Sequence, residues 1–307
     1  MPRAVRGERR GMARAVRATT GLALAGWLGG CSGGPLDPHG PIAAQQYTIM
    51  MNSLIIMLAI VIPTLIAAVA FAWWYRESNK RARYRPDFVY SGRIEIVVWS
   101  IPTLVILFLG GIIWIGSHEL DPAEPIASQA RPTEVQVVAL PWKWLFILPD
   151  QNVASVNELV VPAGSPVHLA MTDASVLNTF WVPQLGGMIY TMNGMTTQMN
   201  LLADHPGTYM GRSAMFSGDG FSDMSFTVRA VPQGEFDQWV TGARGNGPTL
   251  DEAAYGELAK PGLTAKPFTY RGVAPGLFTA ITNQHIPPAP GPANGPGGAV
   301  VPLTAAR

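Results

Sequence analysis

The sequence predicts two transmembrane helices in a hairpin, followed by an all-β sandwich and a small helical extension rich in aromatic residues. Three observations support this prediction. Two apolar runs are each long enough to span a bilayer, which takes ~20 residues. Residues 131–232 then alternate between apolar and polar side chains in short segments separated by turn residues. Beyond residue 232, aromatic side chains are thinly spaced along a more polar chain.

Composition and charge exclude some classes of function. The chain has 307 residues, of which 48% are hydrophobic and 13% charged, with a formal net charge of +1. Residues 117–307 carry nine Lys or Arg against fifteen Asp or Glu, a balance that disfavours nucleic acid as a partner. The single cysteine, Cys31, leaves no intramolecular disulfide and no cysteine-based metal site.

Residues 1–30 have the features of a secretory signal peptide. Six arginines are followed by the apolar run 22–27 and then by Leu28, two glycines and Cys31. This ending is similar to a bacterial lipobox, which implies a lipoprotein with a lipid, such as palmitate, on Cys31. The alternative is a chance cysteine behind an ordinary signal peptide.

The hairpin is expected over residues 47–120, after an extended outer-face tether at 31–46. No charged side chain lies between Tyr47 and Tyr75, so this run is the first predicted span. The loop at 76–85 is basic, which places it on the cytoplasmic side of the membrane. The second span runs from about Ile96 to Ser117. Both the N-terminus and the C-terminal domain are therefore expected on the outer face.

Short alternating segments indicate strands in residues 131–232. They lie at 134–140, 167–171 and 198–202, and turn residues lie at 162–164, 185–187, 205–207 and 218–220. This pattern is typical of an antiparallel sandwich. The extension at 233–283 is expected to form short helices at 235–240 and 250–258, with Thr249 as an N-cap. The tail at 284–307 is rich in Pro, Gly and Ala and is expected to be disordered.

Residues 204–224 resemble the copper loop of cytochrome oxidase subunit II. In that family two cysteines flank a glutamate, a histidine and a methionine follow, and an earlier strand supplies another histidine. These ligand positions fall here on Asn178, Ser213, Met215, Ser217, Phe221 and Met224. Of the six, Met224 alone is a ligand of that family. Serine hydroxyls stay protonated and phenylalanine has no donor atom, so the chain is expected to bind no metal at this loop.

The members of this superfamily that lack the copper are quinol oxidase subunits, so the resemblance points to subunit II of a bo-type ubiquinol oxidase. It implies a cupredoxin-like sandwich followed by an aromatic-rich extension. It also implies that subunit I carries the haems and the catalytic copper, with other small membrane subunits beside it. The complex would oxidise ubiquinol, reduce oxygen to water and pump protons in the bacterial inner membrane, without cytochrome c. The present chain would be a non-redox subunit with no cofactor of its own and no catalytic residue.

Glu95 is the residue expected to take part in proton transfer. Its spacing to Trp99 and Pro102 matches the family's second-helix motif, whose glutamate lies near a proton channel of subunit I. The resemblance thus implies that Glu95 marks a proton entrance. The competing interpretation is an interfacial charge that only marks the helix end beside Arg93.

Trp142 and Trp144 match an aromatic segment that assists electron transfer in copper-bearing relatives. Without a copper donor, they are expected to contribute core and interface area. A rival function is a membrane-anchored, cupredoxin-like lipoprotein that binds or delivers copper through thioethers. Its candidate ligands are seven methionines: Met188, Met192, Met195, Met199, Met210, Met215 and Met224. Core packing is the expected role of this set.

Overall fold

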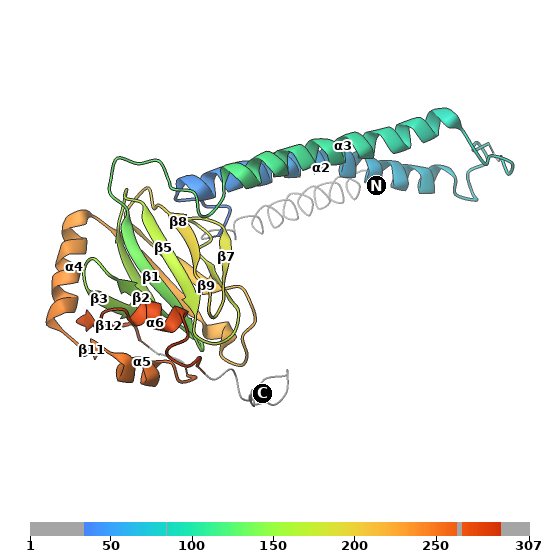
Figure 1. The fold of residues 1–307 in the computed structure, drawn as a ribbon. Helices are drawn as coiled ribbons and strands as arrows, with labels where there is room; N and C mark the ends of the chain where they lie inside the picture. Colours follow the sequence, from blue (N-terminus) through green and yellow to red (C-terminus); the bar gives the residue numbers. More distant parts are fainter. Residues whose placement is uncertain (1–33, 84, 263–265, 290–307) are drawn as a thin grey trace, which may run out of the picture.

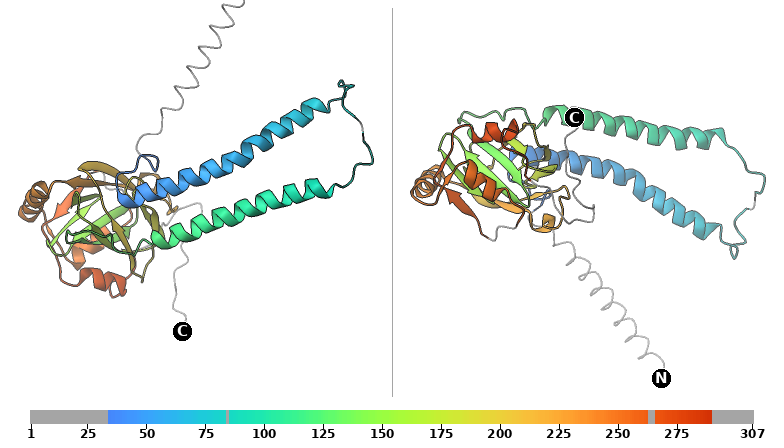
Figure 2. Two further views of the ribbon diagram at one scale, coloured as in Figure 1. Left: turned by 90° about the horizontal axis from the view of Figure 1, so that it is seen from above. Right: turned by 60° about the horizontal axis from the view of Figure 1, so that its bottom comes forward.

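A computed structural model describes residues 34–83, 85–262 and 266–289. Two long helices run side by side away from a two-sheet sandwich, and the extension lies on the side of the sandwich away from them (Figures 1 and 2). The predicted fold class is confirmed. The signal peptide at 1–30 and the lipidation site Cys31 lie outside the described residues.

The hairpin consists of α2 (Pro41–Trp74) and α3 (Gly92–Glu119), both apolar and long enough to cross a membrane. The prediction that α2 starts at Tyr47 was wrong, because the helix begins at Pro41. Proline is favoured in the first turn, where its missing N–H has no intrahelical partner. The described part of the tether therefore shortens to residues 34–40.

The start of α2 is held against the sandwich by backbone contacts. His39 donates its N–H to Gln184 O at 2.8 Å, and Asp204 N–H donates to His39 O at 2.9 Å. Gly40 lies so close to the chain that a Cβ there would collide with the carbonyl oxygen of Leu202. Glycine at this position lets the helix approach the strand end directly.

The sandwich has one six-stranded and one five-stranded sheet. The first has the order β12-β3-β2-β1-β5-β8, with β1 Thr133–Leu140, β2 Lys143–Leu148, β3 Val153–Val156, β5 Val167–Asp173, β8 Thr197–Leu201 and β12 Phe268–Tyr270. The second has the order β4-β10-β9-β6-β7, with β4 Glu158–Pro162, β6 Asn178–Trp181, β7 Met188–Thr191, β9 Gly207–Ser213 and β10 Ser225–Val231. The expected antiparallel arrangement needs correction, since β1 pairs with β5 and β4 with β10 in parallel. Alternation along a strand does not identify its partner, so the sequence left these pairings open.

Aromatic rings fill the space between the two sheets. Trp144 and Phe180 meet edge to face with their centroids 5.5 Å apart, and Phe226 stacks on Phe180 at 4.9 Å. All three side chains are buried. Each such ring removes about 150–250 Å² from water, which makes this cluster a main source of the sandwich's stability.

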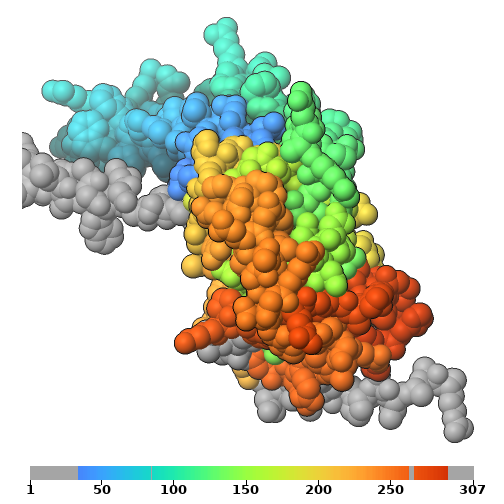
Figure 3. Space-filling model, turned by 90° about the vertical axis from the view of Figure 1, so that its left-hand side faces the viewer, coloured from blue at the N-terminus to red at the C-terminus, as the bar shows by residue number. Residues whose placement is uncertain are grey.

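Residues 250–289 of the extension cover the outer face of the six-stranded sheet, whereas its first helix, Gln233–Gly245, packs against the core between the two sheets. Figure 3 shows the extension, in orange to red, across one side of the domain. The extension comprises α4 Gln233–Gly245, β11 Thr249–Leu250, α5 Glu252–Leu258, β12, β13 Gly272–Val273 and α6 Leu277–Thr282. Leu145 and Ile147 of β2 form an apolar cluster with Tyr255, Tyr270 and other residues of the extension. Strands β1 and β2 are thus buried on both faces. This explains why every residue of β2, and each of the last four residues of β1, is buried instead of alternating with exposed residues.

Three expectations for the extension and tail need correction. The helix expected at 235–240 spans Gln233–Gly245. Thr249 lies in β11, and Asp251 is the N-cap of α5, accepting the N–H of Ala254 at 2.8 Å. Residues 284–289, expected to be disordered, pack on the domain, where Ala289 N–H donates to Ala174 O at 2.7 Å. The rest of the tail lies outside the described residues.

Candidate functional site

The loop between β9 and β10 forms a closed frame. Ser213 ends β9, and Met224 follows the short 3-10 helix η1 (Phe221–Asp223). Ser213 N–H donates to Met224 O at 3.1 Å, and the hydroxyl of Ser217 lies 3.8 Å from Met224 Sδ. The two serines and the methionine therefore occupy one small, buried region at this end of the sandwich.

Asn178 reaches this region from the neighbouring strand. It begins β6, which pairs with β9 in a register that places Phe180 opposite Ser213. Ser213 Oγ donates to Asn178 Oδ1 at 3.1 Å. Asn178, Ser213, Ser217 and Met224 are thus brought together from positions up to 46 residues apart.

Phe221 and Met215 take different positions around this frame. The ring of Phe221 meets that of Phe216 edge to face at 5.7 Å, and it lines a surface depression of about 250 Å³ with Ser213 and Met224. The backbone N–H of Met215 donates to Ser213 Oγ at 3.4 Å. Met215 thus contacts the site through its main chain.

Asp173 is the residue of this site that sequence reasoning missed. It ends β5 and is fully buried. Asn178 Nδ2 donates to its Oδ2 at 2.9 Å, Thr191 Oγ1 donates at 3.3 Å, and Ser175 N–H donates to Oδ1 at 2.8 Å. Burial raises the pKa of Asp173 to about 7, and these hydrogen bonds oppose the rise. An aspartate at a strand end, two residues before a serine, resembles an ordinary turn residue, so the sequence held no signal for it.

The donor set does not fit a copper centre. A binuclear copper site needs thiolates and imidazoles, whereas this frame offers an amide, two hydroxyls and one thioether. The amide and the Ser213 hydroxyl are hydrogen-bonded to each other. Within the described ranges no group of three or more His, Cys, Asp or Glu is placed to hold a metal ion.

The two tryptophans differ in position. Trp142 has a positive φ of 64°, its Nε1 donates to Ser217 O at 3.0 Å, and its ring lies against Gly220, where a Cβ would not fit. Trp144 is fully buried between the sheets. The expectation of interface area from both residues is therefore corrected for Trp144, which has no exposed surface in this chain and belongs to the core.

The methionines do not converge on one point. Met199 and Met224 are buried in the core, whereas Met188, Met195 and Met210 are each more than half exposed. Met210 and Met224 share the depression beside Phe221. Thioethers divided between core and surface form no ligand set of the kind that Cu(I) requires.

Glu95 lies far from the sandwich, in the first turn of α3 at the loop end of the hairpin (Figure 1). Trp99 Nε1 donates to Glu95 Oε2 at 3.2 Å. The spacing of four residues places both side chains on one helix face, which gives a physical reason for the glutamate–tryptophan spacing of the motif.

Comparisons with known proteins cover nearly all of the described chain. Residues 143–231 match the family described as cytochrome c oxidase subunit II, periplasmic domain, and residues 244–289 match the cytochrome oxidase aromatic-rich motif. The ubiquinol oxidase subunit 2 of Acetobacter aceti is 44% identical over 86% of this chain and 87% of its own length. The cytochrome bo(3) ubiquinol oxidase subunit 2 of Pseudomonas aeruginosa is 41% identical over 86% and 80%. The periplasmic domain of subunit II of cytochrome oxidase of Bradyrhizobium japonicum is 24% identical, with a TM-score of 0.37 over 39% of this chain and 98% of that domain.

Proposed function

This chain belongs to the ubiquinol oxidase subunit 2 family, and we propose that it serves its oxidase as a subunit without a redox centre of its own. It is a component of an oxidoreductase complex, and it acts with a partner oxidase subunit. In the proposed arrangement that partner, subunit I, carries the haems and the copper, and ubiquinol delivers the electrons. Cytochrome c has no role, because the loop that would receive its electrons lacks copper ligands.

The observation that supports this proposal is that the side chains at the copper-ligand positions are engaged in hydrogen bonds. Asn178 and Ser213 hydrogen-bond to each other, and Asn178 also donates to Asp173. Hydroxyl and amide groups engaged in this way are poor copper ligands. The frame is retained as a structural element that ties β5, β6 and β9 together.

We further propose that Glu95 stands at a proton entrance. It is a carboxylate at the end of an apolar helix, and Trp99 holds it on one face of that helix. Ionisable groups in such positions commonly mark proton paths. The basic loop at 76–85 places this end of the hairpin on the cytoplasmic side, where pumped protons enter.

The membrane attachment follows from the same reasoning. α2 and α3 anchor the chain in the membrane, and the sandwich matches the periplasmic domain of the cytochrome c oxidase subunit II family. We propose that the sandwich and the N-terminus lie in the periplasm of the bacterial inner membrane. A lipid on Cys31 would add a second anchor close to the start of α2.

The loss of copper ligands is tested by restoring them in the full-length chain. The variant combines Asn178→His, Ser213→Cys, Met215→Glu, Ser217→Cys and Phe221→His. We expect it to bind copper with visible absorbance, whereas the parent chain binds none at this loop. A control with the same changes but both serines retained should remain colourless, because the bridging thiolates are missing. Copper at the loop of the parent chain would contradict the proposal, and a folded, colourless variant would contradict the assignment of these five positions.

A further inference from the structure

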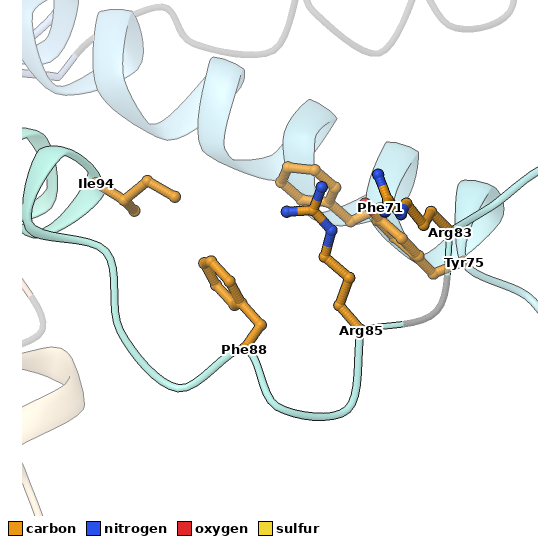
Figure 4. Close-up of a pocket in the computed structure, with 6 residues that line it drawn as sticks. All are labelled: Phe71, Tyr75, Arg83, Arg85, Phe88 and Ile94. Carbon is orange, nitrogen blue, oxygen red and sulfur yellow. The ribbon is translucent and has the colours of Figure 1, made fainter.

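A cavity of about 660 Å³ opens between the two helices at the end of the hairpin away from the sandwich (Figure 4). Three segments line it: the last turns of α2, the connecting loop and the first turn of α3. The lining residues are Phe71, Tyr75, Arg83, Arg85, Phe88 and Ile94. The cavity thus combines four apolar or aromatic side chains with two guanidinium groups.

The two arginines are available for an external anion. Within the described part of the chain, the side chains of Arg83 and Arg85 form no ion pair and no hydrogen bond. Arg76 of the same loop differs, because it donates to Trp73 O at 2.7 Å and to Ser78 Oγ at 3.0 Å. In Figure 4 the guanidinium of Arg85 reaches from the loop toward Phe71, over the gap between the helices.

The cavity lies where a bilayer changes from hydrocarbon to head group. Trp73, Trp74 and Tyr75 end the apolar run of α2, and aromatic residues of this kind mark the membrane–water boundary. Phe71, Phe88 and Ile94 therefore supply apolar surface at this boundary, and Arg83 and Arg85 supply positive charge beside it. Basic pockets between membrane helices at this depth bind lipid phosphate groups.

We propose that this cavity binds one anionic phospholipid of the adjoining leaflet. Its phosphate pairs with Arg83 and Arg85, and the first part of an acyl chain packs on Phe71, Phe88 and Ile94. Charge complementarity favours this occupant over a neutral quinone, which offers the two guanidinium groups no anionic partner. The apolar wall favours it over free phosphate, which has no hydrocarbon to bury. The lipid would join the two helices beside Glu95, because the lining residue Ile94 directly precedes it in the first turn of α3, whatever the electron donor of the complex.

The test uses the oxidase complex purified through this chain, delipidated in detergent and examined by native mass spectrometry. Vesicles of phosphatidylglycerol or of phosphatidylcholine then supply the lipid. We expect phosphatidylglycerol to rebind to the parent complex, and we expect Arg83→Gln with Arg85→Gln to weaken rebinding about thirtyfold, because each arginine near a lipid surface contributes ~1 kcal/mol. The matched control, Lys80→Gln with Arg81→Gln, removes the same charge from exposed positions outside the cavity and should rebind like the parent.

A second variant tests the apolar half. Phe88→Ala keeps both arginines and should weaken phosphatidylglycerol binding. It should not change how readily inorganic phosphate displaces the bound lipid. The proposal is overturned if the arginine pair and the control pair lose lipid equally. It is also overturned if phosphatidylcholine binds as well as phosphatidylglycerol, if inorganic phosphate displaces the lipid at low concentration, or if side chains of a partner subunit fill the cavity.

Discussion

Asp173 ties the frame of the β9–β10 loop to the core of the sandwich. Its carboxylate accepts hydrogen bonds from Asn178, Thr191 and the backbone of Ser175. The packing extends to Tyr255 of the extension, whose pKa is raised by burial and, to a smaller degree, by the charge of Asp173. A single carboxyl group thus lies where three strands and the extension meet.

The stability of the sandwich is expected to depend on pH through Asp173. Its pKa is about 7 in the folded chain and 3.8 ordinarily, so the folded state binds the proton more tightly. The resulting stabilisation is fully present below pH ~4 and is lost as pH rises to ~7, a change on the order of 4 kcal/mol. Urea unfolding followed by tryptophan fluorescence should show this decline in the parent chain and lose it in Asp173→Asn. Asp219→Asn, an exposed control, should keep the decline, and parallel curves for the parent and Asp173→Asn would contradict the assignment.

Glu95 gives the second prediction at the residue scale. Glu95→Gln keeps an oxygen that accepts from Trp99 Nε1 but removes the titratable proton. We expect the haem content of the purified complex to be unchanged and its rate of ubiquinol oxidation to fall severalfold, because a proton relay needs a group that can give and take protons. Asp87→Asn, in the loop that precedes α3, should leave the rate intact. Equal rates for the parent and Glu95→Gln would leave Glu95 as a charge that marks the helix end.

Among the elements, α5 is attached to the sandwich by a buried lysine. Lys143 begins β2, and its Nζ donates to Leu258 O and to Lys260 O, both at 2.9 Å, at the C-terminal end of α5. Burial lowers the pKa of Lys143. The ammonium group neutralises the carbonyl end of a short helix and supplies hydrogen bonds that this helix end would otherwise lack.

Replacing Lys143 with Met should therefore loosen the extension. The two carbonyl groups would stay in a largely buried position without their donor, at a cost of about 2 kcal/mol in the free energy of unfolding. Limited proteolysis should cut the variant faster near residues 258–262 than the parent. Lys260→Met removes only an exposed ion pair with Glu257 and should have much less effect. An equally protease-resistant Lys143→Met chain would show that the apolar cluster alone holds α5.

The sequence predicted best the elements that have a clear pattern of apolar residues along the chain. Two uncharged runs predicted α2 and α3, and alternation predicted β1, β5 and β8. The start of α2 at Pro41 was missed because Gln45 and Gln46 are polar, yet Gln46 lies in the helix and approaches Gly187 of the sandwich. The parallel pairs β1–β5 and β4–β10 depend on contacts between distant segments, which local pattern does not encode.

The candidate site was predictable in outline. The resemblance of this chain to the copper-loop family identified Asn178, Ser213, Ser217 and Met224, and the structure brings these four residues together. What the sequence could not provide was the hydrogen-bond network around Asn178, since Asp173 and Thr191 belong to no motif. Likewise, the burial of Trp144 follows from the packing of two sheets, whereas the aromatic segment 142–146 alone does not separate core from surface.

At the scale of the whole molecule, three parts have three tasks. The hairpin brings Glu95 and the basic cavity together at its loop end. The sandwich holds the frame of the β9–β10 loop, and the extension covers one side of the sandwich (Figures 1 and 3). Under the proposed function, electrons reach the oxidase from quinol in the membrane and do not pass through this chain.

The central claim is that the oxidase containing this chain takes electrons from quinol and not through a copper centre in this subunit. Oxygen uptake by the complex, purified through a tag on this chain, tests it most directly when reduced ubiquinol analogue and reduced cytochrome c are supplied in parallel. We predict rapid uptake with the quinol and none above background with cytochrome c. Sustained uptake with cytochrome c would contradict the account, because it would require an electron-accepting site that the frame of Asn178, Ser213 and Ser217 does not provide.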